Sequence, residues 1–339
     1  MALSADFCMQ RDGIHLDVSV QMSEQVVALY GGSSREQAAV FKCLEGISRP
    51  DRGRIVVNGT VWFDSILHRN LPRRRRSVRR LTQMDRFDGK HRAQEWFGPY
   101  QQKKEALAGA LATQLQLPAL LDRPYEQLMS LERFRLQIAH SLLGEPDLIL
   151  LEETDFSQDE DIRLQQELLL METLPLYEGT VLFSAMTRGA VYRLCQSMCV
   201  LQYGTLQQQY SVRELFERPQ TVAAGRLAGY RNLTAIERLD DTHVFAPAWN
   251  TVLRLGYVPE DAFYLGIHPR SCRISAGPGE NVLPCTVRRK LEQLDAVTVV
   301  AQPEGNARTQ VVVEIPKQQW HGETSLFVQM PPVALLPLR

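Results

Sequence analysis

The sequence lacks any long hydrophobic run. In its 339 residues no apolar stretch approaches the roughly 18 residues that a membrane-spanning helix needs. The first residues, Met1–Asp12, have neither the basic nor the apolar region of a secretory signal peptide. We therefore expect the chain to stay in the cytoplasm.

Closely spaced cysteines are also scarce. Six cysteines are scattered along the chain, and only Cys195 and Cys199 lie near each other. An i,i+4 pair without a second pair does not have the pattern of a zinc site. We predict no disulfide and no cysteine metal site, and interpret these residues as small buried hydrophobes.

The chain has no excess of charge of one sign. A net charge of −1 argues against general adhesion to nucleic acid or membranes, and we expect no nucleic-acid partner. The local exception is Arg73–Arg76, followed by Arg79 and Arg80. Such a run can bind RNA or anionic lipid, but no base-stacking aromatic residues are interleaved with it. A solvated surface or a contact with a protein partner is the favoured interpretation.

What is present predicts two domains. A hydrophobic content of 44% and a charged content of 23% are ordinary for a globular protein of this length. Strand and helix patterns alternate through about residue 215, which predicts a three-layer α/β domain. The expected strands are 26–30, 148–151, 181–184 and 198–201, with a hairpin around Asn58-Gly59 and helices at 38–44, 101–117, 131–143 and 190–196.

After Arg231 the pattern changes. Short strand-like segments at 243–246, 251–255, 296–301, 310–314 and 325–329 lie between glycine, proline and asparagine residues, and long helical patterns vanish. This predicts a small all-β domain.

The segment 28–46 has the layout of a phosphate-binding loop between a strand and a helix. The motif G-x-x-x-x-G-K-[ST] uses glycines, a lysine and a hydroxyl to hold phosphate and Mg²⁺. Counting from Gly31, the second glycine falls on Glu36, the lysine on Gln37 and the hydroxyl on Ala38. Taken alone, an ordinary strand–turn–helix that never held a nucleotide is the simpler interpretation. The neighbouring segments argue against that interpretation.

The order of these segments resembles an ABC transporter ATPase, most of all the molybdate and sulfate importer ATPases. The similar passages cover nearly the whole chain: Gly46–Ile55 after the P-loop helix, Leu71-Pro72 and the arginine run leading to Gln83, Ala139–Glu153, and Glu214–Leu233 before the final β domain. The resemblance implies an α/β, P-loop NTPase-like three-layer domain at residues 1–230 with a helical insert at about 87–145. It also implies a small oligonucleotide-binding-like (TOBE) β barrel at residues 232–339.

The resemblance also implies site positions, and several of them have lost the family's chemistry. The phosphate loop corresponds to Gly31, Gly32, Ser33, Gln37 and Ala38. The signature that meets the partner subunit's ATP falls on Leu128–Glu132, where Met129, Ser130 and Leu131 replace its Ser-Gly-Gly. The switch histidine position holds Met186.

Other positions keep a compatible residue. Glu152 stands at the Walker B aspartate, a weak Mg²⁺ position, and Glu153 at the water-activating carboxylate. Gln83 and Asp159 fall on the Q-loop glutamine and the D-loop aspartate. For Glu152 and Glu153, a remnant of a metal and water site is favoured over polar residues that merely end a strand. For Gln83, a surface glutamine and a retained Q-loop contact are equally good interpretations.

The implied function is the ATP-binding subunit of an oxyanion importer with impaired or absent hydrolysis. ATP and Mg²⁺ are the implied cofactors, and we expect their binding to be weak or absent. The implied partners are a membrane permease, which would hold the chain at the inner face of the membrane, and a second copy or an intact ATPase.

Two alternatives stay open at this point. One is a working but divergent transport ATPase, and the other is a regulator outside transport whose β domain senses an oxyanion. Molybdate, tungstate or sulfate could bind that domain through Arg270, Arg273, Arg288, Arg289 and Lys290, although solvated side chains are the simpler interpretation.

Overall fold

The structure is a computed structural model that describes residues 3–81, 92–95, 97, 105–306 and 308–339. By its contacts the chain divides into two compact units, Met1–Val212 and Arg213–Arg339. This division falls before the domain end that we predicted at residue 230. The reason is that α8 packs on the β unit, where the Val222 amide donates to the carbonyl of Arg339.

Among the described residues, eleven strands of the first unit form one sheet in the order β6-β5-β4-β1-β2-β11-β10-β3-β9-β8-β7. Strands β10, β3, β9, β8 and β7 run parallel, whereas β5, β4, β1 and β2 pair antiparallel. The bounds are β1 Leu3–Arg11, β2 Ile14–Met22, β3 Val26–Tyr30, β4 Arg52–Val57, β5 Thr60–Asp64, β6 Arg69–Asn70, β7 Val78–Arg80, β8 Leu148–Glu152, β9 Thr180–Ala185, β10 Ser197–Gln202 and β11 Thr205–Ser211.

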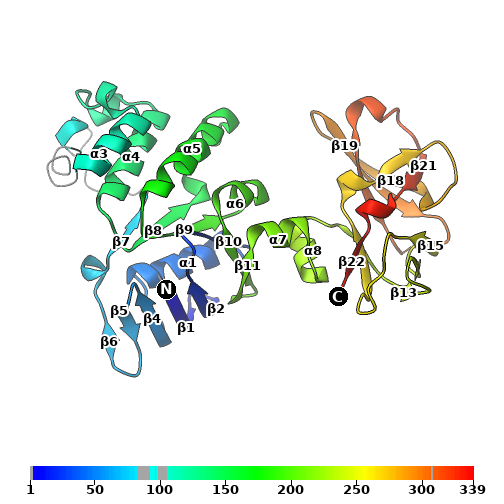
Figure 1. Cartoon of the computed structure of the whole chain (residues 1–339), viewed down its shortest axis with the longest axis horizontal. Coiled ribbons are helices and arrows are strands. Elements are labelled where there is room, and N and C mark those ends of the chain that lie inside the picture. Colours follow the sequence, from blue (N-terminus) through cyan, green and yellow to red (C-terminus); the bar gives the residue numbers. More distant parts are fainter. Residues whose placement is uncertain (1–2, 82–91, 96, 98–104, 307) are drawn as a thin grey trace. The chain divides into compact units, whose positions relative to one another are not determined.

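The helices of this unit flank the sheet (Figure 1). They are α1 Ser34–Glu45, α3 Glu105–Gln114, α4 Ser130–Leu143, α5 Glu160–Thr173 and α6 Arg188–Leu194. Strands β3, β8 and β9 are almost wholly buried, which explains their continuous apolar sequence. Strand β1 alternates buried and accessible residues because only one of its faces is covered.

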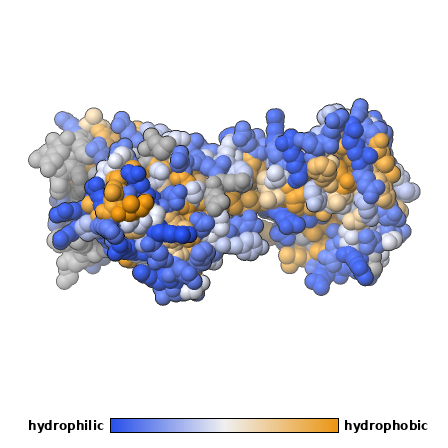
Figure 2. Space-filling view, turned by 90° about the horizontal axis from the view of Figure 1, so that it is seen from below, coloured by the Kyte–Doolittle hydropathy of each residue, from blue (hydrophilic) through white to orange (hydrophobic). Residues whose placement is uncertain are grey.

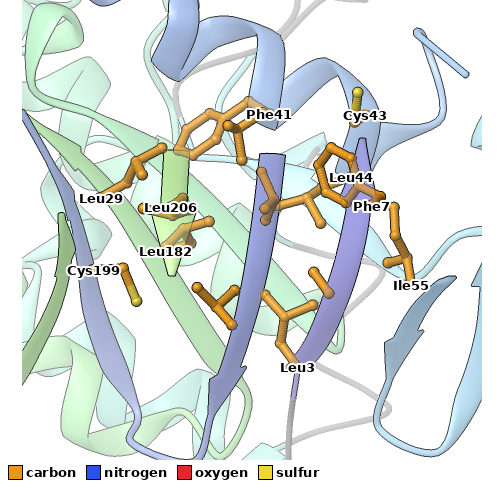
Figure 3. Packing of buried hydrophobic residues seen from close by; sticks show 14 of the residues in the cluster. Leu3, Phe7, Leu29, Phe41, Cys43, Leu44, Ile55, Leu182, Cys199 and Leu206 are labelled. Atoms are coloured by element: carbon orange, nitrogen blue, oxygen red, sulfur yellow. The ribbon is translucent and has the colours of Figure 1, made fainter. Parts of the chain in front are cut away.

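The main core lies between α1 and the antiparallel strands. Figure 3 shows Phe41 and Leu44 of α1 facing Phe7 of β1 and Ile55 of β4, all of them fully buried. Phe7 is 1% exposed. It therefore serves as a core residue of the first unit.

The second unit begins with α7 (Val212–Glu217, across the boundary) and α8 (Val222–Ala228) and is otherwise built from strands. In its described residues they form sheets in the orders β12-β16-β22, β13-β14-β15 and β17-β21-β18-β19-β20 around one apolar core. Their bounds are β12 Asn232–Ala235, β13 Glu237–Arg238, β14 His243–Ala246, β15 Thr251–Arg254, β16 Tyr264–Ile267, β17 Arg273–Ser275, β18 Val282–Glu292, β19 Ala296–Pro303, β20 Val311–Pro316, β21 Ser325–Gln329 and β22 Leu336–Leu338.

The predicted architecture is confirmed: an α/β unit with one mixed sheet precedes an all-β region consistent with an oligonucleotide-binding-like domain. The hairpin at Asn58-Gly59 is also confirmed, since both residues have positive φ between β4 and β5. In the described part of the chain no helix has both the length and the apolar character to span a membrane.

Candidate functional site

The loop at Gly31 is short and tightly packed. Strand β3 ends at Tyr30 and α1 begins at Ser34, so only Gly31–Ser33 connect them. Both glycines have positive φ, and a Cβ at Gly31 would lie 2.8 Å from the carbonyl oxygen of Leu201. Helix α1 thus already includes Glu36 and Gln37. In a phosphate loop of the G-x-x-x-x-G-K type, the residues at these two positions would still belong to the loop.

Gln37 fills the space beneath this loop. Its side chain is 1% exposed, and Nε2 donates to the carbonyl of Gly31 at 2.8 Å and to that of Ala185 at 3.2 Å. Its Oε1 accepts from the hydroxyl of Ser184. The position that corresponds to the phosphate-binding lysine therefore holds an uncharged amide whose donor and acceptor are both engaged within the protein.

Glu36 caps the helix on which it stands. Its Oε2 accepts from the backbone N–H of Ser33 at 2.7 Å, and the Ser33 hydroxyl accepts from the N–H of Glu36 at 3.2 Å. The bond from the Ser33 backbone lowers the pKa of the Glu36 carboxyl. A helix N-terminus favours an anion, and here the chain supplies its own carboxylate.

Glu152, at the end of β8, is engaged by an arginine. Arg80 of β7 forms ion pairs with Glu152 and, at 3.1 Å, with Glu45. Glu45 is 3% exposed, so Arg80 neutralises two carboxylates at this edge of the sheet. Ala38 offers no hydroxyl to a metal. No group of three His, Cys, Asp or Glu residues that could hold a metal ion occurs in the described ranges.

Glu153 is buried and serves as a backbone acceptor. It is 6% exposed, and its Oε2 accepts from the N–H groups of Met186 and Thr187, the latter at 2.8 Å. Its Oε1 accepts from the Thr187 hydroxyl and lies 3.4 Å from the guanidinium of Arg163. The carboxylate that the resemblance assigns to water activation thus holds the segment that leads into α6.

The signature positions lie at the start of α4. Met129 is the N-cap and is 69% exposed, Ser130 is the first helical residue, and Leu131 is partly buried. Glu132 Oε2 accepts from the Met129 N–H at 2.8 Å, so this helix N-terminus is also capped by a carboxylate of the chain. Asp159 caps α5 by accepting from the Ile162 N–H at 3.1 Å, and Gln83 lies outside the described residues.

The structure gathers part of the predicted set. The carboxyl ends of the neighbouring strands β3, β9 and β8 bring together the loop at Gly31, Gln37, Glu152 and Glu153. The signature residues and Asp159 stand instead at the starts of α4 and α5.

Our interpretation of the arginine run was wrong for part of it. Arg73, Arg74 and Arg75 are exposed, but Arg76 is 5% exposed and donates to the carbonyls of Cys43 and Leu44 at the end of α1. Arg79 donates to the carbonyl of His140 near the end of α4. Basic side chains favour helix C-termini, and a pattern of charges along the sequence does not show which helix end lies nearby.

Sequence reasoning also missed the partners that engage the site. These are Ser184 for Gln37, Arg80 for Glu152, and Thr187 with Arg163 for Glu153. Only Arg80 had a sequence signal that could have placed it inside the fold. It follows Val78 at the two-residue spacing of one strand face and precedes the apolar Leu81. At the positions that the resemblance assigns to MgATP, the lysine's cation and the motif's hydroxyl are missing, and the carboxylates already have partners in the protein.

Comparisons with known proteins agree with the fold. Residues 15–155 match the model of the ABC transporter family. Among curated relatives, the molybdenum import ATP-binding protein ModC of Rhizobium johnstonii is 23% identical over 312 residues, covering 90% of this chain and 82% of that protein. ModC 1 of Azotobacter vinelandii is 27% identical, covering 86% and 85%. The chain is thus similar, at modest identity, to ABC transporter ATP-binding subunits.

Other relatives have other cargo in their names. The Fe(3+) ions import ATP-binding protein FbpC of Streptomyces coelicolor is 25% identical, covering 86% of this chain and 78% of that protein. Solved structures support the fold: one ATP-binding subunit of an ABC transporter has a TM-score of 0.51 at 17% identity, with 64% of this chain and 93% of that one covered. CbiO1 of Clostridium perfringens gives 0.51 at 18%, covering 67% and 94%.

Proposed function

We propose that this chain is the cassette subunit of a molybdate-type oxyanion importer and that it does not hydrolyse ATP itself. The observation that carries this proposal is the buried amide of Gln37, held by the Gly31 and Ala185 carbonyls and by Ser184. Most of phosphoryl-transfer catalysis comes from positioned charges and N–H groups around the phosphates. Here the cation is absent and the helix N-terminus already carries the Glu36 carboxylate.

The names of the relatives supply the transport side of the proposal. Two of the relatives described above are molybdenum import ATP-binding proteins. An iron import ATP-binding protein has a similar identity, so the sequence of this subunit does not determine the cargo, which other subunits would select. In such a complex the chain would contact a membrane permease on the cytoplasmic side. It would pair either with itself or with an intact ATPase whose own loop holds ATP.

The two alternatives have less support. A working divergent ATPase would need Glu153 to leave the Met186 and Thr187 amides, which would lose those bonds. An oxyanion sensor would need free cations in the β unit. Of the five candidate cations, Arg270 pairs with Glu314 at 2.8 Å, Lys290 with Glu292 at 2.9 Å, and Arg288 with the side chain of Gln302, while Arg273 and Arg289 are exposed.

The first test is calorimetry of the purified full chain with MgATP. We expect no heat of binding at micromolar concentrations, and a micromolar Kd would contradict the proposal. The double variant Glu36→Gly with Gln37→Lys restores the two motif residues. Recovery of binding in this variant would identify the lost side chains as the cause, whereas no recovery would identify the short Gly31–Ser33 connection as the cause.

The second test is steady-state turnover. We expect negligible ATPase activity from the chain alone, unchanged by Glu153→Gln, because a carboxylate activates water only where a γ-phosphate is held nearby. A clear loss of turnover in this variant would establish a divergent but working site. Copurification of the membrane complex and identification of its subunits tests the transport side, and calorimetry with molybdate, tungstate and sulfate tests the sensor alternative.

A further inference from the structure

The turn between β5 and β6 carries two large apolar residues that face solvent. Ile66 is 86% exposed and Leu67 is 67% exposed. Turn residues are usually polar or glycine, so a pair of exposed aliphatic side chains at a hairpin tip is unusual. Figure 2 shows apolar side chains gathered next to strongly hydrophilic ones on one face of the first unit.

The tip is held in this exposed arrangement. The carboxylate of Asp64 accepts from the N–H groups of Ile66 and Leu67 at 2.9 and 3.0 Å. Asp64 itself is 6% exposed and pairs with Arg54 at 3.5 Å. Because the turn backbone is fixed, the two apolar side chains are presented to a partner without a cost of ordering the loop.

Basic residues follow the tip in the sequence, first on β6 and then on the 3-10 turn Arg73–Arg75. From Ile66 to Arg75 the sequence contains four arginines and no acidic residue, although the whole chain has a net charge of −1. Arg69, Arg73, Arg74 and Arg75 are all exposed, and Arg73 also pairs with the buried Glu45 at 3.7 Å. We name this set, together with Ile66 and Leu67, the basic hairpin surface.

Arg76 anchors this surface to the fold. It donates to the carbonyl of Leu71 at 2.9 Å, to the side chain of Asn70 at 3.0 Å and to the α1 carbonyls of Cys43 and Leu44. The 3-10 turn Arg73–Arg75 is therefore tied to both the hairpin and the end of α1. The exposed arginines stand on a rigid base.

We propose that the basic hairpin surface binds the anionic headgroup region of a lipid bilayer, with Ile66 and Leu67 inserted among the lipids. Stable attachment to a membrane takes two signals, and this surface has both an apolar one and a polybasic one. An acidic protein would satisfy the arginines as well, but it would need a pocket for the protruding aliphatic pair, whereas a bilayer needs none. The inference uses no residue of the nucleotide site and is independent of ATP hydrolysis.

Flotation of the purified full chain with lipid vesicles tests the proposal. Vesicles of phosphatidylcholine with about one third phosphatidylglycerol should carry the protein at low salt, whereas vesicles of phosphatidylcholine alone should not. Binding should fall steeply as NaCl is raised from about 0.05 to 0.5 M, because the charges are exposed. Failure of the wild-type chain to float with anionic vesicles would overturn the proposal.

Variants locate the interaction. The triple change R73Q/R74Q/R75Q should weaken partitioning on the order of 100-fold, and I66S/L67S by about 10-fold or more. The matched control is L291S/L294S at the β18–β19 turn, where exposed leucines lie beside Glu292 and Asp295. Equal losses in the control and hairpin variants would contradict the proposal. So would unchanged flotation of both hairpin variants, and an acidic protein partner would then be the remaining explanation for this surface.

Discussion

The side-chain oxygen of Gln37 on α1 accepts a hydrogen bond of 2.5 Å from the hydroxyl of Ser184 on β9, although the two residues are 147 positions apart. The bond joins the first turn of the helix to the end of a buried parallel strand. Glu153 binds the amides directly after the same strand, at Met186 and Thr187. Two positions that the family resemblance assigns to nucleotide chemistry thus stabilise the same part of the fold.

Substitution of Gln37 should measure that stabilising role. Gln37→Met keeps the volume but leaves the Gly31 and Ala185 carbonyls and the Ser184 hydroxyl without their partner, so we expect a loss of about 1–3 kcal/mol in the free energy of unfolding. Ser184→Ala should cost about 1 kcal/mol. Urea unfolding of both single variants and the double variant gives their coupling, which we expect to be nonzero. Additive losses would mean that the bond contributes nothing.

Much of the fold followed from local sequence patterns. The apolar runs of β3, β8 and β9 and the asparagine-glycine turn between β4 and β5 are strong local signals, because burial on both faces and positive φ each restrict residue choice. The start of α1 was not predicted: we expected Ala38, and the helix begins at Ser34. The cap made by Ser33 and Glu36 extends it, and the loop interpretation hid that capping box.

The candidate site could be located from the sequence, but its state could not. The strand order brings Gln37, Glu152 and Glu153 to one edge, as expected for parallel strands. Their partners come from Arg80, Ser184 and Thr187, which are distant in the sequence from the residues that they engage. A hydrogen bond or ion pair between such positions leaves no periodic signal in a single sequence.

Arg80 should be more important for stability than a surface arginine. Its side chain is 14% exposed and lies between the carboxylates of Glu45 and Glu152. Arg80→Met leaves the buried Glu45 carboxylate beside a second carboxylate, with only the more distant Arg73 at 3.7 Å as its cation. We therefore expect a loss near the lower end of the about 3–5 kcal/mol that is typical of a broken buried ion pair. Adding Glu45→Gln and Glu152→Gln should recover most of the loss. Arg74→Met, at an exposed position in the same run, is the control and should change the unfolding free energy by less than about 0.5 kcal/mol.

Glu153 should behave as a structural residue. Glu153→Ala removes the acceptor of two N–H groups and one hydroxyl, so we expect a loss of about 2–4 kcal/mol, measured by thermal or urea unfolding. Gln158→Ala, an exposed neighbour, is the control. Unchanged stability in Glu153→Ala would show that the fold does not need the carboxylate. Glu153 would then again be a candidate for activating water in ATP hydrolysis.

The stability of the first unit should fall between neutral and mildly acidic pH through His140. Burial, with a smaller contribution from the nearby Arg79 guanidinium, lowers the pKa of this histidine from 6.5 to about 4. Between these two pKa values the unfolded chain binds the proton and the folded chain does not. The free energy of unfolding therefore rises with pH across that window and decreases as the pH falls through it. At pH 5 the free energy of unfolding should be about 2 kcal/mol lower than at pH 7.

Urea unfolding at both pH values should show a smaller decrease for His140→Gln than for the wild type, while His15→Gln, at an exposed position, should behave as the wild type does. An equal decrease in His140→Gln and the wild type would assign the acid sensitivity to other groups.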